Sequence, residues 1–76
     1  MPVYKAPDMT IDEFIHITDK IQEIGARLVE AGLSDEFVES TSVMQELLDQ
    51  EGEQVTLHEH EENNRIIIIQ KKVGEQ

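Results

Sequence analysis

Four consecutive isoleucines dominate the segment Arg65-Ile66-Ile67-Ile68-Ile69-Gln70-Lys71-Lys72. A strand of this composition is apolar on both faces and must be covered on both sides. The rest of the chain predicts one further strand and two short helices, and two strands alone form a marginal sheet in water. We therefore expect a second copy of the chain, or a partner protein, to complete the sheet through Ile66, Ile67, Ile68 and Ile69.

The residues around the isoleucines predict a β-hairpin over residues 54–73. Asn63 and Asn64 tolerate the positive φ of a two-residue type I′ turn. Such a turn sets four cross-strand pairs: Glu62 with Arg65, His60 with Ile67, His58 with Ile69, and Thr56 with Lys71. The face expected to receive the helices then carries Val55, Leu57, Glu59, Ile66 and Ile68. The uncovered face carries Ile67 and Ile69 beside His58 and His60.

Two amphipathic helices are predicted upstream of the hairpin. Thr10 and Glu13 fit a capping box, in which the hydroxyl accepts an amide proton and the carboxylate reaches back. Apolar residues then recur at spacings of three and four, which predicts a helix over residues 10–31. A second helix is predicted over residues 35–50. Its weak point is the low-propensity run 40–42, where the helix can bend or where Ser42 with Gln45 can cap a fresh start.

The predicted fold is α+β, an antiparallel helix pair followed by a β-hairpin (ααββ), with its sheet completed by dimerisation. Residues 1–9 contain two prolines and are predicted to form an extended N-terminal arm. Residues 10–76 are predicted to form a single α+β domain. A chain of 76 residues without cysteine has one small core and no disulfide to reinforce it.

The charge balance restricts the classes of function. Acidic residues number 17 against 6 basic ones, giving a net charge of −11, which argues against direct binding of DNA or RNA phosphates. The chain lacks a membrane span of about 20 apolar residues and a secretory signal, so we expect a cytoplasmic protein that does not contact the membrane. It also lacks a cysteine nucleophile, a glycine-rich phosphate loop and a recognisable serine–histidine motif. We therefore expect no enzymatic activity and no cofactor.

The acidic composition suggests a basic protein as the partner. Carboxylates on a rigid scaffold can occupy the positions of backbone phosphates and attract the groove of a nucleic-acid-binding enzyme or regulator. We expect a small acidic inhibitor or regulator that mimics nucleic acid, of the kind made by phages and mobile elements. The carboxylates predicted to face the partner are Glu46, Asp49, Glu53, Glu59, Glu61 and Glu62.

Two other interpretations remain open. The negative charge can serve solubility alone, and the protein would then be a structural or adaptor protein that binds through its isoleucine-rich hairpin. The other is a metal-binding protein, because His58 and His60 lie two apart on a predicted strand and would project from the same face. For the histidines, the competing interpretation is that they are solvated side chains near a turn.

Overall fold

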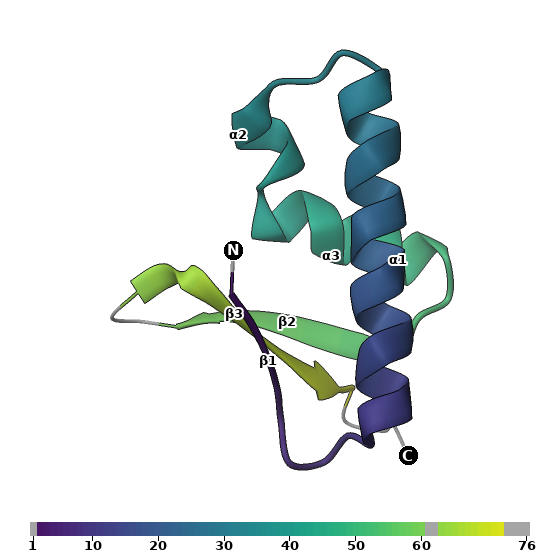
Figure 1. Ribbon diagram of the computed structural model, residues 1–76, viewed down its shortest axis with the longest axis vertical. Coiled ribbons are helices and arrows are strands. Elements are labelled where there is room, and N and C mark those ends of the chain that lie inside the picture. Colours follow the sequence, from purple (N-terminus) through teal and green to yellow (C-terminus); the bar gives the residue numbers. More distant parts are fainter. Residues whose placement is uncertain (1, 61–62, 73–76) are drawn as a thin grey trace.

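The computed structural model describes residues 2–60 and 63–72. Its elements follow one another in the order β1, α1, α2, α3, β2, β3 (Figure 1). Their bounds are β1 Val3–Lys5, α1 Ile11–Glu30, α2 Asp35–Val38, α3 Thr41–Gln50, β2 Val55–His60 and β3 Asn63–Lys71. The α+β class predicted from the sequence is confirmed, but the order of elements differs from ααββ.

The long helix α1 begins where its capping box predicts. The Thr10 hydroxyl accepts the Glu13 amide at 3.1 Å, and the Glu13 carboxylate accepts the Thr10 amide at 2.8 Å. At the other end, Gly32 takes a φ of 82°, which a glycine adopts without steric cost. The Leu33 amide then bonds to the Leu28 carbonyl at 3.2 Å and closes the last turn.

The prediction of one helix over residues 35–50 is wrong, because the chain forms two helices, α2 and α3. Ser40 has extended backbone angles, with φ −70° and ψ 121°, and its hydroxyl accepts the Val43 amide at 3.3 Å. Ser40 is therefore the N-cap of α3. A serine satisfies free amides better at a helix start than inside a helix, and this local gain outweighs the continuous apolar pattern.

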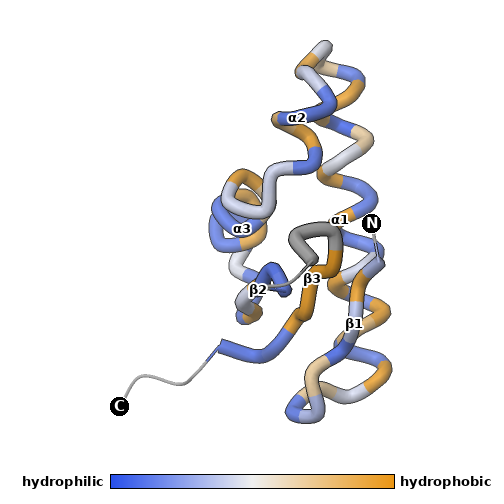
Figure 2. Tube along the Cα trace, turned by 90° about the vertical axis from the view of Figure 1, so that its left-hand side faces the viewer, coloured by the Kyte–Doolittle hydropathy of each residue, from blue (hydrophilic) through white to orange (hydrophobic). Residues whose placement is uncertain are grey.

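The N-terminal arm contributes a strand that the sequence did not predict. β1 lies parallel to β3, with Val3 opposite Ile67 and Lys5 opposite Ile69. The sheet order is β1-β3-β2, so the isoleucine strand is central within one chain, as Figure 2 shows. The same chain thus supplies the third strand, for which the sequence predicts a second copy or a partner protein.

The predicted hairpin register is wrong by one residue. Leu57 lies opposite Ile69 and His58 opposite Ile68, whereas the prediction paired His58 with Ile69. Asn63, predicted as a turn residue, begins β3 and pairs with His60, and the register shifts between Glu59 and His60. An isoleucine run lacks the alternation that fixes a register, so the turn and this irregularity determine it.

The one-residue shift exchanges the two faces of β3 relative to β2, whose Val55 and Leu57 lie on the helix-covered face as predicted. Ile67 and Ile69 are buried, at 3% and 0% exposure, and belong to the core. The helices cover this face, and the core unites residues from both helical and sheet layers: Met9, Ile17, Ile24, Met44, Leu48, Val55, Leu57, Ile67 and Ile69. Ile66 and Ile68 are half-buried and point to the opposite face because side chains alternate along a strand.

The outer edge of β2 is paired with a side chain of α3. The Gln45 amide nitrogen donates to the Val55 carbonyl at 3.0 Å, and its oxygen accepts the Leu57 amide at 2.7 Å. These are the backbone groups that a neighbouring strand would otherwise bind. Gln45 therefore anchors α3 to the sheet and covers the first half of this edge.

Candidate functional site

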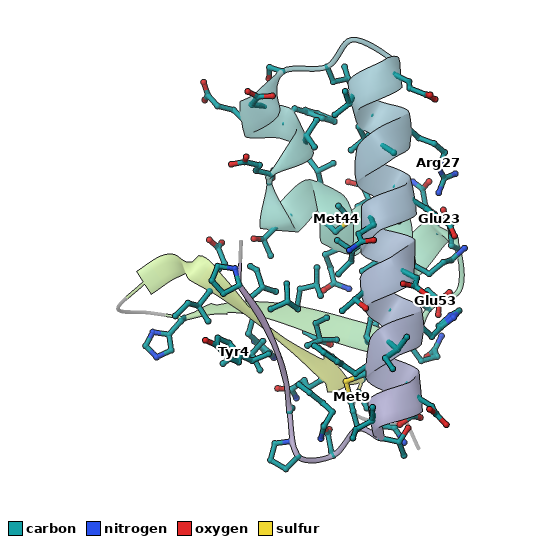
Figure 3. The ribbon with its side chains drawn as sticks, viewed as in Figure 1. Tyr4, Met9, Glu23, Arg27, Met44 and Glu53 are labelled. Carbon is teal, nitrogen blue, oxygen red and sulfur yellow. The ribbon has the colours of Figure 1, made fainter. Side chains whose placement is uncertain are left out.

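Ion pairs gather where α1, the start of β2 and the end of β3 meet. Glu51 accepts hydrogen bonds from Lys20 at 2.7 Å and Arg27 at 2.6 Å, both of which project from α1. His16 lies 3.0 Å from Glu53. In Figure 3, Arg27, Glu23 and Glu53 lie along one side of α1, opposite the side on which Met44 lies.

Two further ion pairs hold the end of β3. Lys71 lies 3.0 Å from Glu13 at the start of α1, and Lys72 lies 2.9 Å from Asp49 on α3. Both partners of each pair are partly exposed, so each pair contributes little to stability on its own. Together they orient the strand relative to the two helices.

These contacts shift the ionisation of the paired groups. The hydrogen bonds from Lys20 and then Arg27 lower the pKa of the Glu51 carboxyl, and Glu51 in turn raises the pKa of Lys20. Lys72, followed by the Gln45 amide, lowers the pKa of Asp49. The backbone amide of Thr10, followed by Lys71, lowers the pKa of Glu13.

A cavity of about 610 Å³ lies beside this cluster. Its ionisable lining residues are Asp12, Glu13, His16, Glu53, Lys71 and Lys72. Charges of both signs are interleaved there and largely pair with one another, so the cavity does not favour a ligand of either charge. Its lining residues include no serine, threonine or cysteine that the His16–Glu53 pair could activate as a nucleophile.

The remaining carboxylates leave the helical layer negatively charged. The chain contains no lysine or arginine between residues 28 and 64. Lys5 does not form an ion pair within the described ranges, and its ammonium donates to the Ala6 and Met9 carbonyls at 3.2 and 2.9 Å. Exposed carboxylates without an ion pair among the described residues are Asp8, Asp12, Asp19, Glu23, Glu30, Asp35, Glu36, Glu39, Glu46 and Glu59.

The structure distributes the predicted partner-facing carboxylates over several elements. Glu46 is exposed on α3, and Glu59 is exposed near the end of β2. Asp49 and Glu53 pair with Lys72 and His16, respectively. Glu61 and Glu62 lie outside the described residues.

The acidic surface extends beyond these six positions to carboxylates of α1 and of the α2 segment, including Glu30, Asp35, Glu36 and Glu39. A signal for them exists in the sequence. The segment without basic residues begins just before Glu30, and it includes all of α2.

A groove opens between α1, α2 and β1, on the side of α1 away from the ion pairs. Its volume is about 940 Å³. Its lining is mostly apolar or uncharged and consists of Pro2, Val3, Phe14, Thr18, Ile21, Gln22, Gly25, Val38, Glu39 and Met44. Concave apolar surfaces of this kind are common binding sites.

The uncovered face of the sheet is a second apolar surface. Ile66 and Ile68 are half-buried there, beside the more exposed Tyr4, which pairs with Ile68 across β1 and β3. Thr56, His58 and Gln70 complete the described residues of this face, and none of these six residues is acidic. Of the four isoleucines predicted to mediate self-association, only Ile66 and Ile68 lie on this surface.

The structure adds no further ligand to the predicted metal site. His58 is exposed on β2, and the register shift before His60 interrupts the alternation on which a common face depends. Within residues 2–60 and 63–72, no group of three or more histidine, cysteine, aspartate or glutamate side chains is placed to hold a metal ion. The metal site stays a prediction.

The described helices are all too short or too polar to cross a bilayer. Comparisons of the chain with protein-family models, with curated proteins and with solved structures find no match.

Proposed function

We propose that this protein is a non-catalytic binding protein that presents the acidic surface of its helical layer to a basic partner. The observation that carries the proposal is the separation of charge. Within the described part of the chain, four basic side chains, Lys20, Arg27, Lys71 and Lys72, are engaged in ion pairs around Glu51 and the end of β3. The carboxylates of α2 and of the outer, solvent-facing side of α1 form no such ion pair. Their uncompensated negative electrostatic field attracts a protein of opposite charge.

The partner class that fits this surface best is a nucleic-acid-binding protein. Its groove is built to receive phosphates, and carboxylates on rigid helices can take their place. Binding would inhibit or regulate that protein in the cytoplasm. A non-catalytic role is also supported by burial, because the described residues include no buried polar or charged side chain.

A competition assay tests the proposal. A fluorescent DNA duplex is bound to each of several basic DNA-binding domains, and its displacement by this protein is followed by anisotropy. We expect displacement at about 50 mM salt and its loss at about 200 mM, because ionic contacts are screened. The variant Glu36→Lys/Glu39→Lys should compete more weakly than Asp8→Lys/Glu59→Lys, which changes the net charge equally but away from α2.

Two results would contradict the proposal. Absence of displacement by the wild type at low salt would reject mimicry of nucleic acid. An equal loss in the two charge-reversal variants would show that net charge acts without a defined helical surface.

A second candidate function is favoured by the uncovered sheet face. Because its described residues include no carboxylate, two copies can meet there without like-charge repulsion, despite the net charge of −11. The protein would then be a homodimer or an adaptor that binds through its hairpin. Sedimentation equilibrium should show a wild-type dimer that Ile68→Glu dissociates, and a wild type that stays monomeric at high concentration would reject self-association.

A further inference from the structure

We infer that the groove between α1, α2 and β1 binds an amphipathic helix of the partner protein, with lysine or arginine flanking its apolar face. The inference rests on the proposed function, because it names the place on the acidic surface where the basic partner docks. It follows from the surface of α1, the dimensions of the groove and the charges on its rims.

The helix α1 carries a second stripe besides the one buried in the core. Its residues follow one another at alternating spacings of four and three, as in the seam of a coiled coil: Ile11, Ile15, Thr18, Gln22, Gly25 and Val29. None of them is charged, although α1 is otherwise rich in charge. Ile11, Ile15 and Val29 are 66%, 50% and 59% exposed, so this stripe is not covered by the described residues of the chain.

The middle of this stripe forms one wall of the groove. Thr18, Gln22 and Gly25 line it from α1, and Val38 and Met44 line the opposite wall. A Cβ at Gly25 would lie 4.0 Å from Val38 Cγ1, which is ordinary contact, so a longer side chain there would project into the groove.

The floor of the groove has a place for an anchoring side chain. A depression of about 30 Å³ shares Ile21, Val38 and Met44 with the groove and reaches Leu57 and Ile67 of the sheet. This volume suits the end of one apolar side chain, and methionine at its edge adapts easily to different shapes. Anchors in such pockets usually dominate the energy of an interface.

The length of the groove suits a short helix. Its lining residues on α1 extend from Phe14 to Gly25, which corresponds to about 17 Å along the helix axis. That is about three helical turns, enough for anchors at positions i, i+4 and i+7 of a docked helix. An extended segment would not match the coiled-coil spacing of the stripe as well.

The charges on the two rims select the occupant. Glu39 is the charged residue of the lining and belongs to the wall opposite α1. Asp19 follows Thr18 on α1, beside the stripe and outside the lining. Both carboxylates are exposed and have no ion pair with another described residue. A second copy docking its own α1 would bring like charges together, whereas a helix with basic flanks would form ion pairs on both sides.

Two synthetic peptides test this inference by calorimetric titration at low salt. Each has about 14 residues and leucines at the same i, i+4 and i+7 spacing, and the flanks are lysine in one and glutamate in the other. We expect the lysine peptide to bind at least about tenfold more tightly. Gly25→Leu, which fills the groove, should weaken its binding about tenfold, whereas Ala26→Leu adds the same side chain outside the lining and should leave binding unchanged.

Two charge-reversal variants provide a second test, which does not depend on whether Gly25→Leu folds. Glu39→Lys should weaken binding of the lysine peptide more than Glu46→Lys, which makes the same charge change on α3 outside the groove. If the two variants of each pair weaken binding of the lysine peptide equally, the groove is not the binding site. The acidic-surface proposal would be unaffected by that result. Equal binding of the two peptides would overturn both, and a wild-type dimer that Gly25→Leu dissociates would replace the basic helix with a second copy.

Discussion

Glu51 shows how one side chain compensates an unfavourable position. It is the C-cap of α3, where the helix dipole is negative and a carboxylate is disfavoured. Lys20 and Arg27 approach from positions about two turns apart on α1 and bind one carboxylate oxygen each. The negative end of α3 and its acidic cap thus attract two basic side chains of α1, and this attraction joins the two helices.

The Glu51 cluster predicts a specific pH dependence. The pKa of Glu51 lies below its ordinary value of 4.5, so the free energy that the cluster adds is present above that pH and is lost as pH falls through the lower, folded pKa. Glu51→Gln should therefore be less stable than wild type at neutral pH, and the difference should narrow below about pH 4. Urea unfolding across this range measures it, with Glu46→Gln as a control outside any ion pair. A difference that stays constant into acid would contradict the assignment.

At the scale of the element, β3 shows what a uniform sequence leaves undetermined. Its isoleucines predict a strand reliably, but the four residues are identical and cannot specify which two face the helices. Pairing with β1 on one side and β2 on the other determines this orientation. Both pairings depend on residues distant in sequence.

The two faces of β3 should respond differently to truncation. Ile69 is fully buried, so Ile69→Ala should cost about 2–5 kcal/mol, a large part of the stability of so small a domain. Ile68 is half-buried on the uncovered face, and Ile68→Ala in the monomeric protein should cost about 1 kcal/mol. Chemical denaturation of the two variants measures both values. A larger loss for Ile68 would mean that the faces are reversed.

Local signals in the sequence predicted local structure well. The capping box located the start of α1, and Gly32 its end, because each acts on residues within one turn. The low-propensity run at residues 40–42 marked the weak point of the second predicted helix. Whether it bends or breaks depends on the Ser40 cap, which competes with the apolar stripe.

Non-local structure was less predictable. Nothing within residues 1–9 indicates a parallel strand, since its partner lies more than 60 residues away. For the same reason, the sequence predicted an acidic protein but not the side on which the charge is neutralised. The pairs Lys20–Glu51 and Lys72–Asp49 form only when the elements pack together.

At the scale of the whole molecule, the separation of charge has an energetic cost. The ion pairs are confined to one side, and the carboxylates on the helical layer repel one another. Self-repulsion of this kind destabilises a compact chain and is screened by salt.

Salt should therefore stabilise this protein. Raising sodium chloride from about 20 to about 300 mM at pH 7 should increase the melting temperature, because screening relieves more repulsion than it weakens attraction. The variant Glu36→Gln/Glu39→Gln, which carries fewer like charges, should show a smaller increase. Circular dichroism at the two salt concentrations measures both, and a lower melting temperature in salt would mean that the ion pairs dominate.

The Gln45 amide also limits how copies of the sheet can polymerise. If the edge of β1 in one copy joined the edge of β2 in the next, the contact would repeat without closing and would build a filament. Gln45 already occupies the Val55 and Leu57 backbone groups that this head-to-tail contact needs. The covered half of the β2 edge is closed to this contact, which favours β1 meeting β1 about a two-fold axis, an assembly that stops at two copies.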